Sequence, residues 1–195
     1  MKRTLLFFSV LCLFFIAAQA QQADFQKVAA KYKNVNTVTA DVKKTTHRTA
    51  MAKDVVTYGK LTMKRPNEVS IIMDGGKDQL IMKGSTFTMV ANGKKHTTTS
   101  QANAQFVSFQ AVFESFLAGG QKSISQLSDL KMTKSGNMLI LTITPNATTK
   151  KEARRMMFTS FVLSIDTKTD EIKSIRMNEK AGNYTEYSFS RFVLK

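Results

Sequence analysis

Cysteine is almost missing from this chain of 195 residues, because Cys12 is the only one. Cys12 lies in an apolar N-terminal run, and removal of that run would leave no disulfide, thiol nucleophile or cysteine metal site. Tryptophan is absent, proline occurs twice, and no apolar run reaches the roughly 20 residues of a transmembrane helix. Stability must therefore come from a hydrophobic core, and the length is sufficient for one domain.

Motifs for catalysis and metal binding are also missing. His47 and His96 lie in segments rich in threonine and lysine, without a second histidine or a carboxylate at metal-ligand spacing. There is no glycine-rich phosphate loop and no G-x-S-x-G nucleophile elbow, and the acidic residues fall mostly in turn-like segments. We therefore expect no enzymatic activity, no cofactor and no bound metal.

The N-terminus has the pattern of a secretory signal peptide. Lys2-Arg3 form a basic region, Leu5 to Ala18 an apolar region, and Ala18-Gln19-Ala20 a small-x-small cleavage site. We expect cleavage after Ala20, with a signal peptide at 1–20 and one domain at 21–195 that folds outside the cytoplasm.

Positive charge dominates, with a formal net charge of +15. Such a balance favours acidic partners, namely nucleic acid, anionic lipid head groups or acidic proteins. The basic residues are scattered in short pairs, which is typical of a solvated surface, and export argues against a nucleic-acid role. Eleven methionines and fourteen phenylalanines suit either an adaptable apolar surface or an ordinary core, and composition alone favours the core.

Helical periodicity occurs in two main places. From Asp24 onward, one face of a helix carries Phe25, Val28, Ala29 and Tyr32. The segment from Ala104 to Leu117 carries a wider apolar stripe, with Asn103 as its expected cap and Gly119-Gly120 as its expected end. A shorter helix is expected from Ser123 to Leu127.

Strand signals fill the rest of the chain, with a period of two between turn residues. The expected strands, about ten, begin near Val38 and end at Leu194, and the helix at Ala104–Leu117 interrupts them. The fold class that this order predicts is α+β, with a strongly curved antiparallel sheet that forms an incomplete β-barrel. The N-terminal helix and the helical insertion are the available lids for its concave face.

The segment Gly59-Lys60-Leu61-Thr62-Met63-Lys64-Arg65-Pro66-Asn67 resembles the G-x-L-x-x-K-R-P-N signature of the LolA family of periplasmic outer-membrane lipoprotein carriers. The order of signal peptide, helix, strands, helical insertion and further strands agrees with that family. The resemblance implies a periplasmic monomer that shields the acyl chains of a lipoprotein in an apolar cavity. It also implies an inner-membrane lipoprotein-releasing transporter and an outer-membrane acceptor as partners. A LolA-like binding or sensor protein for another apolar ligand is the alternative, and an enzyme is a more distant one.

The resemblance also suggests a site. Arg65 would reach toward the lid and hydrogen-bond it, which favours the closed state, because guanidinium offers several N–H donors in a fixed fork. The lipid-binding and lid residues that we expect are inward-facing apolar side chains of the sheet and of the helical insertion. They are Leu61, Met63, Met73, Met82, Met89, Phe106, Phe109, Phe113 and Phe116, together with Arg65.

Overall fold

The computed structural model describes residues 19–195 except residues 92, 100–102 and 148. The predicted signal peptide therefore lies outside the described residues, apart from its last two positions. The strands are β1 (Thr37–His47), β2 (Val55–Lys64), β3 (Glu68–Met73), β4 (Asp78–Lys83), β5 (Thr86–Ala91), β6 (Lys94–Thr99), β7 (Leu130–Ser135), β8 (Met138–Ile143), β9 (Phe158–Asp166), β10 (Glu171–Glu179) and β11 (Tyr184–Leu194). The helices are α2 (Val107–Leu117), α3 (Lys150–Arg155) and an N-terminal helix at residues 19–30.

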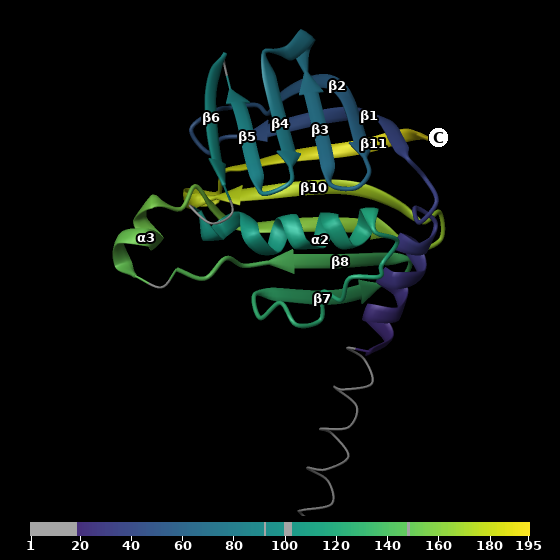
Figure 1. Ribbon diagram of the computed structural model, residues 1–195. Coiled ribbons are helices and arrows are strands. Elements are labelled where there is room, and N and C mark those ends of the chain that lie inside the picture. The colour runs from purple at the N-terminus through teal and green to yellow at the C-terminus, as the bar shows by residue number, and fades with distance from the viewer. Residues whose placement is uncertain (1–18, 92, 100–102, 148) are drawn as a thin grey trace, which may run out of the picture.

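All these strands form one antiparallel sheet in the order β6-β5-β4-β3-β2-β1-β11-β10-β9-β8-β7. Among the described residues the outer strands β6 and β7 do not pair with each other, so the sheet curls around without closing (Figure 1). A register shift between Thr39 and Asp41 interrupts the β1–β11 ladder, and such irregularities bend a strand. The predicted α+β fold with an incomplete antiparallel barrel is confirmed.

The core occupies the concave face of this sheet. Alternate residues of each strand point inward, as the period of two requires, so that β1 buries Val38, Ala40 and Val42. The helix α2 lies along this face (Figure 1), where Phe109 stacks on Phe161 of β9 with ring centroids 4.6 Å apart. At the start of α2, Phe106 stacks on Phe87 of β5 at 3.9 Å. The aromatic stripe of the helical insertion therefore fills the space between the two flanks of the sheet.

Polar side chains of α2 also connect it to both flanks. Gln110 donates a hydrogen bond to the carbonyl of Gly84, between β4 and β5. Ser108 donates to Asp129, just before β7, at 2.6 Å. Ser108 is buried, and a buried hydroxyl needs such a partner. These hydrogen bonds add to the apolar packing that holds α2 over the sheet.

The N-terminal helix packs at the far end of α2. Its predicted inward face is confirmed, since Phe25, Val28, Ala29 and Tyr32 are at most 1% exposed. The Tyr32 ring lies 4.4 Å from the ring of Phe116, and its hydroxyl donates to the carbonyl of Asp170 at 2.8 Å. Burial raises the pKa of Tyr32, and the nearby carboxylates of Glu171 and Asp170 raise it further. The helix therefore closes the end of the concave face at which β1 begins.

Three local predictions differ from the structure. The helix expected at Ser123–Leu127 is wrong, because this segment forms turns and irregular backbone. The N-terminal helix already includes residues 19–23, before Asp24. Asn103 does not cap α2, because its side chain accepts from the amide of Gln105 and the helix begins through a 3-10 turn, Ala104–Phe106.

The helix α3 was not predicted, although the sequence contains its signal. Thr149 precedes it, and the hydroxyl oxygen of Thr149 accepts a hydrogen bond from the backbone N–H of Glu152 at 3.1 Å. A threonine followed three residues later by a glutamate is the capping-box pattern of a helix start. The many basic residues around it favoured a solvated turn instead. In Figure 1 this helix projects from the end of the molecule opposite the N-terminal helix.

Candidate functional site

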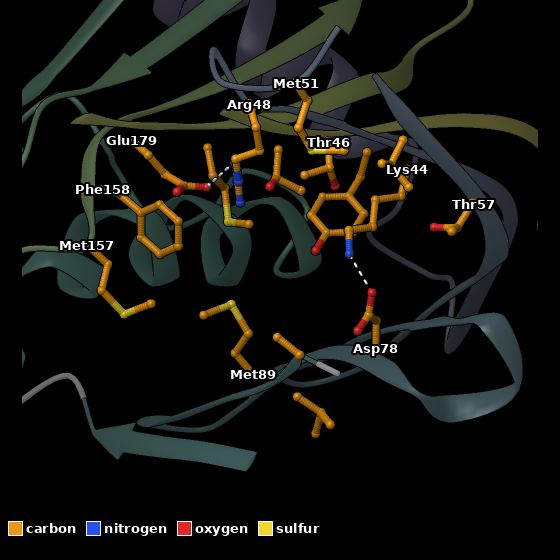
Figure 2. Close-up of a pocket in the computed structure, with 16 residues that line it drawn as sticks. Lys44, Thr46, Arg48, Met51, Thr57, Asp78, Met89, Met157, Phe158 and Glu179 are labelled. Carbon is orange, nitrogen blue, oxygen red and sulfur yellow. Dashed lines mark hydrogen bonds and ion pairs between the residues drawn. The ribbon is translucent and has the colours of Figure 1, made fainter. Parts of the chain in front are cut away.

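A cavity of about 450 Å³ opens at the end of the concave face that lies away from the N-terminal helix. Its volume is within the range of about 300–1,000 Å³ that small-molecule sites occupy. The apolar part of its wall consists mainly of Met51, Val55, Met89, Met157, Phe158 and Met177. The polar part consists of Lys44, Thr46, Arg48, Thr57, Asp78, Glu179 and Thr185 (Figure 2).

The inward face of each strand changes character where α2 no longer covers it. Along β1 the inward positions continue from Val42 to Lys44 and Thr46, and along β4 they continue from Leu80 back to Asp78. The same parity that builds the core therefore carries polar and charged side chains into the cavity. The cavity is an extension of the core surface, with a polar lining at its open end.

Two ion pairs cross the wall of the cavity. Lys44 Nζ donates to Asp78 Oδ2 at 2.6 Å, and the two side chains are 15% and 20% exposed. Arg48 Nη1 lies 3.0 Å from Glu179 Oε1. Both pairs are visible in Figure 2, in which Lys44 and Asp78 point toward each other. Pairing compensates in part for the cost of removing these charges from water.

Tyr187 of β11 also lines the cavity and is 5% exposed. Burial raises the pKa of its phenol, and the negative charges of Asp78 and Glu179 raise it further. A phenol that stays neutral at ordinary pH contributes a largely apolar ring with one polar tip. The wall at this point therefore combines an aromatic surface with a hydrogen-bonding group.

Exposed apolar side chains surround the opening. Met51, Val55 and Met157 are each close to half exposed, and each also lines the cavity. We call these three residues the mouth. Methionine adapts readily to different apolar shapes, so the mouth suits the entry of a flexible apolar group.

Most of the predicted lipid-binding residues lie deeper than this cavity. Among them only Met89, which is half-buried, lines it. The remaining apolar residues of the prediction are buried in the single core cluster beneath and on α2. These are Leu61, Met63, Met73, Met82, Phe106, Phe109, Phe113 and Phe116. The structure therefore brings them together as packed core, and their contact with a ligand stays a prediction.

Arg65 is exposed and lies next to the N-terminal helix. Its Nη1 donates to the carbonyl of Lys33, in the turn that ends this helix, and its backbone N–H donates to the carbonyl of Asn36 at 3.1 Å. A cation at the carboxyl end of a helix satisfies carbonyls that have no partner within the helix. Arg65 therefore contacts the N-terminal lid, and no hydrogen bond between it and α2 occurs among the described residues.

A polar pair between His47 and Asp54 is not signalled by the sequence. His47 Nδ1 lies 2.7 Å from Asp54 Oδ1, and the His47 ring stacks on Tyr184 with centroids 4.9 Å apart. His47 and Asp54 meet because the chain turns between β1 and β2, and their spacing in the sequence does not signal this proximity. In the part of the chain that the structure describes, no group of three histidine, cysteine or acidic side chains is arranged to hold a metal ion. None of the helices described there is long and apolar enough to span a membrane.

A family model with the description "Outer membrane lipoprotein carrier protein LolA" matches residues 33–195. A comparison with curated proteins finds no matching sequence.

Several solved structures are similar at low identity. A DUF1329 family protein from Desulfovibrio piger is 11% identical over 92% of this chain and 93% of that chain, with a TM-score of 0.44. A LolA superfamily protein from Nitrosomonas europaea is 11% identical over 92% of this chain and 94% of that chain, with a TM-score of 0.38. The lipoprotein LppX from Mycobacterium tuberculosis is 10% identical over 89% and 95%, with a TM-score of 0.40.

Proposed function

The chain belongs to the LolA family, since that family's model matches residues 33–195, and from this premise we propose that it is a periplasmic carrier of lipoproteins. The carrier shields the acyl chains of its cargo while the cargo crosses an aqueous compartment to the outer membrane. Its partners are the acylated lipoprotein, an inner-membrane transporter that releases it and an outer-membrane acceptor. We propose no enzymatic role, because the chemistry required is binding and release.

The observation that carries this proposal is an apolar concave face with an unclosed edge and a cavity at one end. Each methylene removed from water contributes about 0.8 kcal/mol, so even one acyl chain gains substantially from this surface. The mouth supplies an apolar entrance, and Met89 and Phe158 continue the apolar wall inward. A chain that enters there leaves water progressively.

The helix α2 determines how much cargo the carrier holds. The cavity of about 450 Å³ has the size of a small-molecule site, whereas a lipoprotein anchor has several long chains. Binding all of them requires α2 to move away from the sheet and to expose the surface that Phe109 now covers. Its polar connections to Gly84 and Asp129 are few. The larger cost of this movement is exposure of the apolar stripe of α2, and acyl chains bound beneath the helix would cover that surface again.

The size of the cavity also favours a second candidate function. With α2 in place, the cavity suits one acyl chain or another small apolar ligand better than a whole lipoprotein anchor. A LolA-like protein that binds such a ligand would use the same mouth without displacement of α2. The position of α2 with ligand bound therefore distinguishes the two functions.

The test is isolation of the exported protein in mild buffer, followed by native mass spectrometry and lipid extraction. A carrier should copurify with acylated peptide or lipid, and the delipidated protein should take up a synthetic triacylated lipopeptide and deliver it to acceptor membranes. The same peptide without acyl chains is the matched control. Failure of the delipidated protein to bind the triacylated form would refute the carrier role, and binding of small apolar ligands alone would favour the second candidate.

A further inference from the structure

Three inward positions on β1, β2 and β4 place polar groups together in the cavity. Lys44 of β1 is paired in register with Thr57 of β2, and Asp78 lies at the start of β4. Each follows the inward parity of its strand, beyond the last buried apolar residue. The sheet therefore gathers an ammonium, a hydroxyl and a carboxylate at one side of the cavity (Figure 2).

Among the described residues, the hydroxyl of Thr57 has no hydrogen-bond partner. Its Oγ1 is buried, and it forms no hydrogen bond with any residue that the structure describes. A buried hydroxyl that is left unpaired costs free energy, and in a native structure it calls for an explanation. Thr57 lines the cavity next to Lys44 on the neighbouring strand, a place where a bound molecule can supply the missing partner.

Lys44 also has hydrogen-bonding capacity that the described residues leave unused. Its ammonium carries three donors, and one of them reaches Asp78 across β2 and β3. A largely buried ion pair is often no more stabilising than apolar residues of the same volume. Stability alone therefore gives little reason for a lysine and an aspartate on the inward face of this sheet.

The second cation of the cavity is bound more completely. Arg48 Nη1 donates to the carbonyls of His47 at 3.0 Å and Tyr184 at 3.4 Å, and it also pairs with Glu179. These backbone contacts hold the guanidinium against the end of the sheet. Lys44 is the cation that can change partner with the least loss.

We propose that Lys44 and Thr57 bind the anionic head group of a single-chain amphiphile whose acyl chain lies along Met89 and Phe158. This inference rests on the proposed function, because it presumes that the cavity accepts an acyl chain. The head group is a negatively charged oxygen acid, either the carboxylate of a fatty acid or the phosphate of a lysophospholipid. It replaces Asp78 as the partner of Lys44, accepts from the ammonium and forms the hydrogen bond that Thr57 lacks.

The proposal assigns opposite roles to Lys44 and Asp78. Removing the ammonium should weaken the binding of an anion, whereas removing the competing carboxylate should strengthen it. A purely structural ion pair would show neither a preference for anions nor this opposition in sign. The adjacent Lys43 provides a matched control, because it lies on the same strand, carries the same charge and points outward to solvent.

The experiment measures dissociation constants of the delipidated full chain for palmitate, for 1-palmitoyl lysophosphatidylglycerol and for hexadecanol, an uncharged analogue, at pH 8. The variants are Lys44→Gln, Lys44→Arg, Asp78→Asn and the control Lys43→Gln, each checked for a wild-type circular dichroism spectrum. We expect Lys44→Gln to weaken binding of at least one anionic ligand about tenfold, or about 1.4 kcal/mol. Hexadecanol affinity should be unchanged, and Lys44→Arg should restore most of the loss. Asp78→Asn should tighten anion binding, and Lys43→Gln should behave as wild type.

The outcomes separate this inference from the proposed function. If the wild type binds all three ligands but Lys44→Gln and Lys43→Gln are indistinguishable, the head-group site is refuted while acyl binding stands. If the wild type binds none of the three ligands and no lipopeptide, both the head-group site and the proposed function are refuted. Dependence on Lys44 for palmitate alone or for the lysophospholipid alone supports the inference and identifies the head group. Should Lys44→Gln unfold, weaker anion binding by Asp78→Asn would be sufficient to overturn the proposal.

Discussion

Phe158 forms the boundary between the cavity and the aromatic core. One side of its ring lines the cavity, and on the other side lie Phe106, at a centroid distance of 6.2 Å, and Phe161, at 5.3 Å. Phe158→Ala should therefore extend the cavity toward α2 without changing the strand order. Phe161→Ala is the matched control, because Phe161 is fully buried, does not line the cavity and also stacks on Phe109.

The magnitude of the destabilisation follows from this packing. Phe→Ala changes in cores cost about 3–5 kcal/mol, and the cost increases with the void that remains. Phe158 already faces an open cavity on one side, so we expect about 3 kcal/mol, or a decrease of about 6–12 °C in Tm. Phe161 packs against three other rings, so its removal should cost about 5 kcal/mol.

The assay combines urea denaturation with a series of fatty alcohols of increasing length. Affinity for the wild type should rise about fourfold per methylene, which corresponds to about 0.8 kcal/mol, until the chain fills the cavity. In Phe158→Ala this rise should continue to longer chains, whereas in Phe161→Ala it should stop where it does in the wild type. An unchanged limiting length in a folded Phe158→Ala protein would refute the view that this ring closes the inner end of the cavity.

Three further predictions concern the lids and one turn. Arg65→Leu should leave the sheet folded but loosen the N-terminal helix by about 1 kcal/mol, because a charged donor to its final turn is lost. Hydrogen exchange at residues 25–33 should therefore accelerate, and unchanged exchange would contradict this role. Gly119→Ala should lower Tm more than Gly136→Ala. Both glycines have positive φ, of 69° and 57°, so both substitutions share a conformational cost of about 1–2 kcal/mol. Only at Gly119 would the added Cβ also lie 2.7 Å from a side-chain atom of Lys33, in the turn that ends the N-terminal helix. Equal decreases in Tm would show that this contact relaxes freely. The pKa of Asp166 is lowered, chiefly because its carboxylate accepts a hydrogen bond from the backbone N–H of Lys168 at 2.8 Å. The stability that Asp166 contributes is therefore present above about pH 4 and is lost as the pH falls through the lowered pKa of the folded state. The Tm difference between wild type and Asp166→Ala should therefore shrink from pH 5 to pH 2, and a constant difference would contradict the assignment.

The succession of strands, the two lids and their buried apolar positions could be predicted because they depend on local periodicity. Phe25 and Tyr32 are seven residues apart, so they lie on the same helical face, and both are buried as expected. The same reasoning failed at Ser123–Leu127, where a short apolar pattern does not distinguish a helix turn from a loop. It also missed Lys44 as an inward residue, which lies near the end of β1 (Thr37–His47).

The sequence by itself determined that this chain builds a curved antiparallel sheet with an aromatic helix against it, because side-chain alternation is set within a few residues. Only the tertiary structure decided which part of the concave face is covered and which part is open. That division depends on contacts between residues far apart in the chain, such as Phe109 with Phe161 and Gln110 with Gly84. Packing of α2 fills the middle of the face with predicted site residues, and it leaves the cavity to Lys44, Asp78 and the methionines of the mouth.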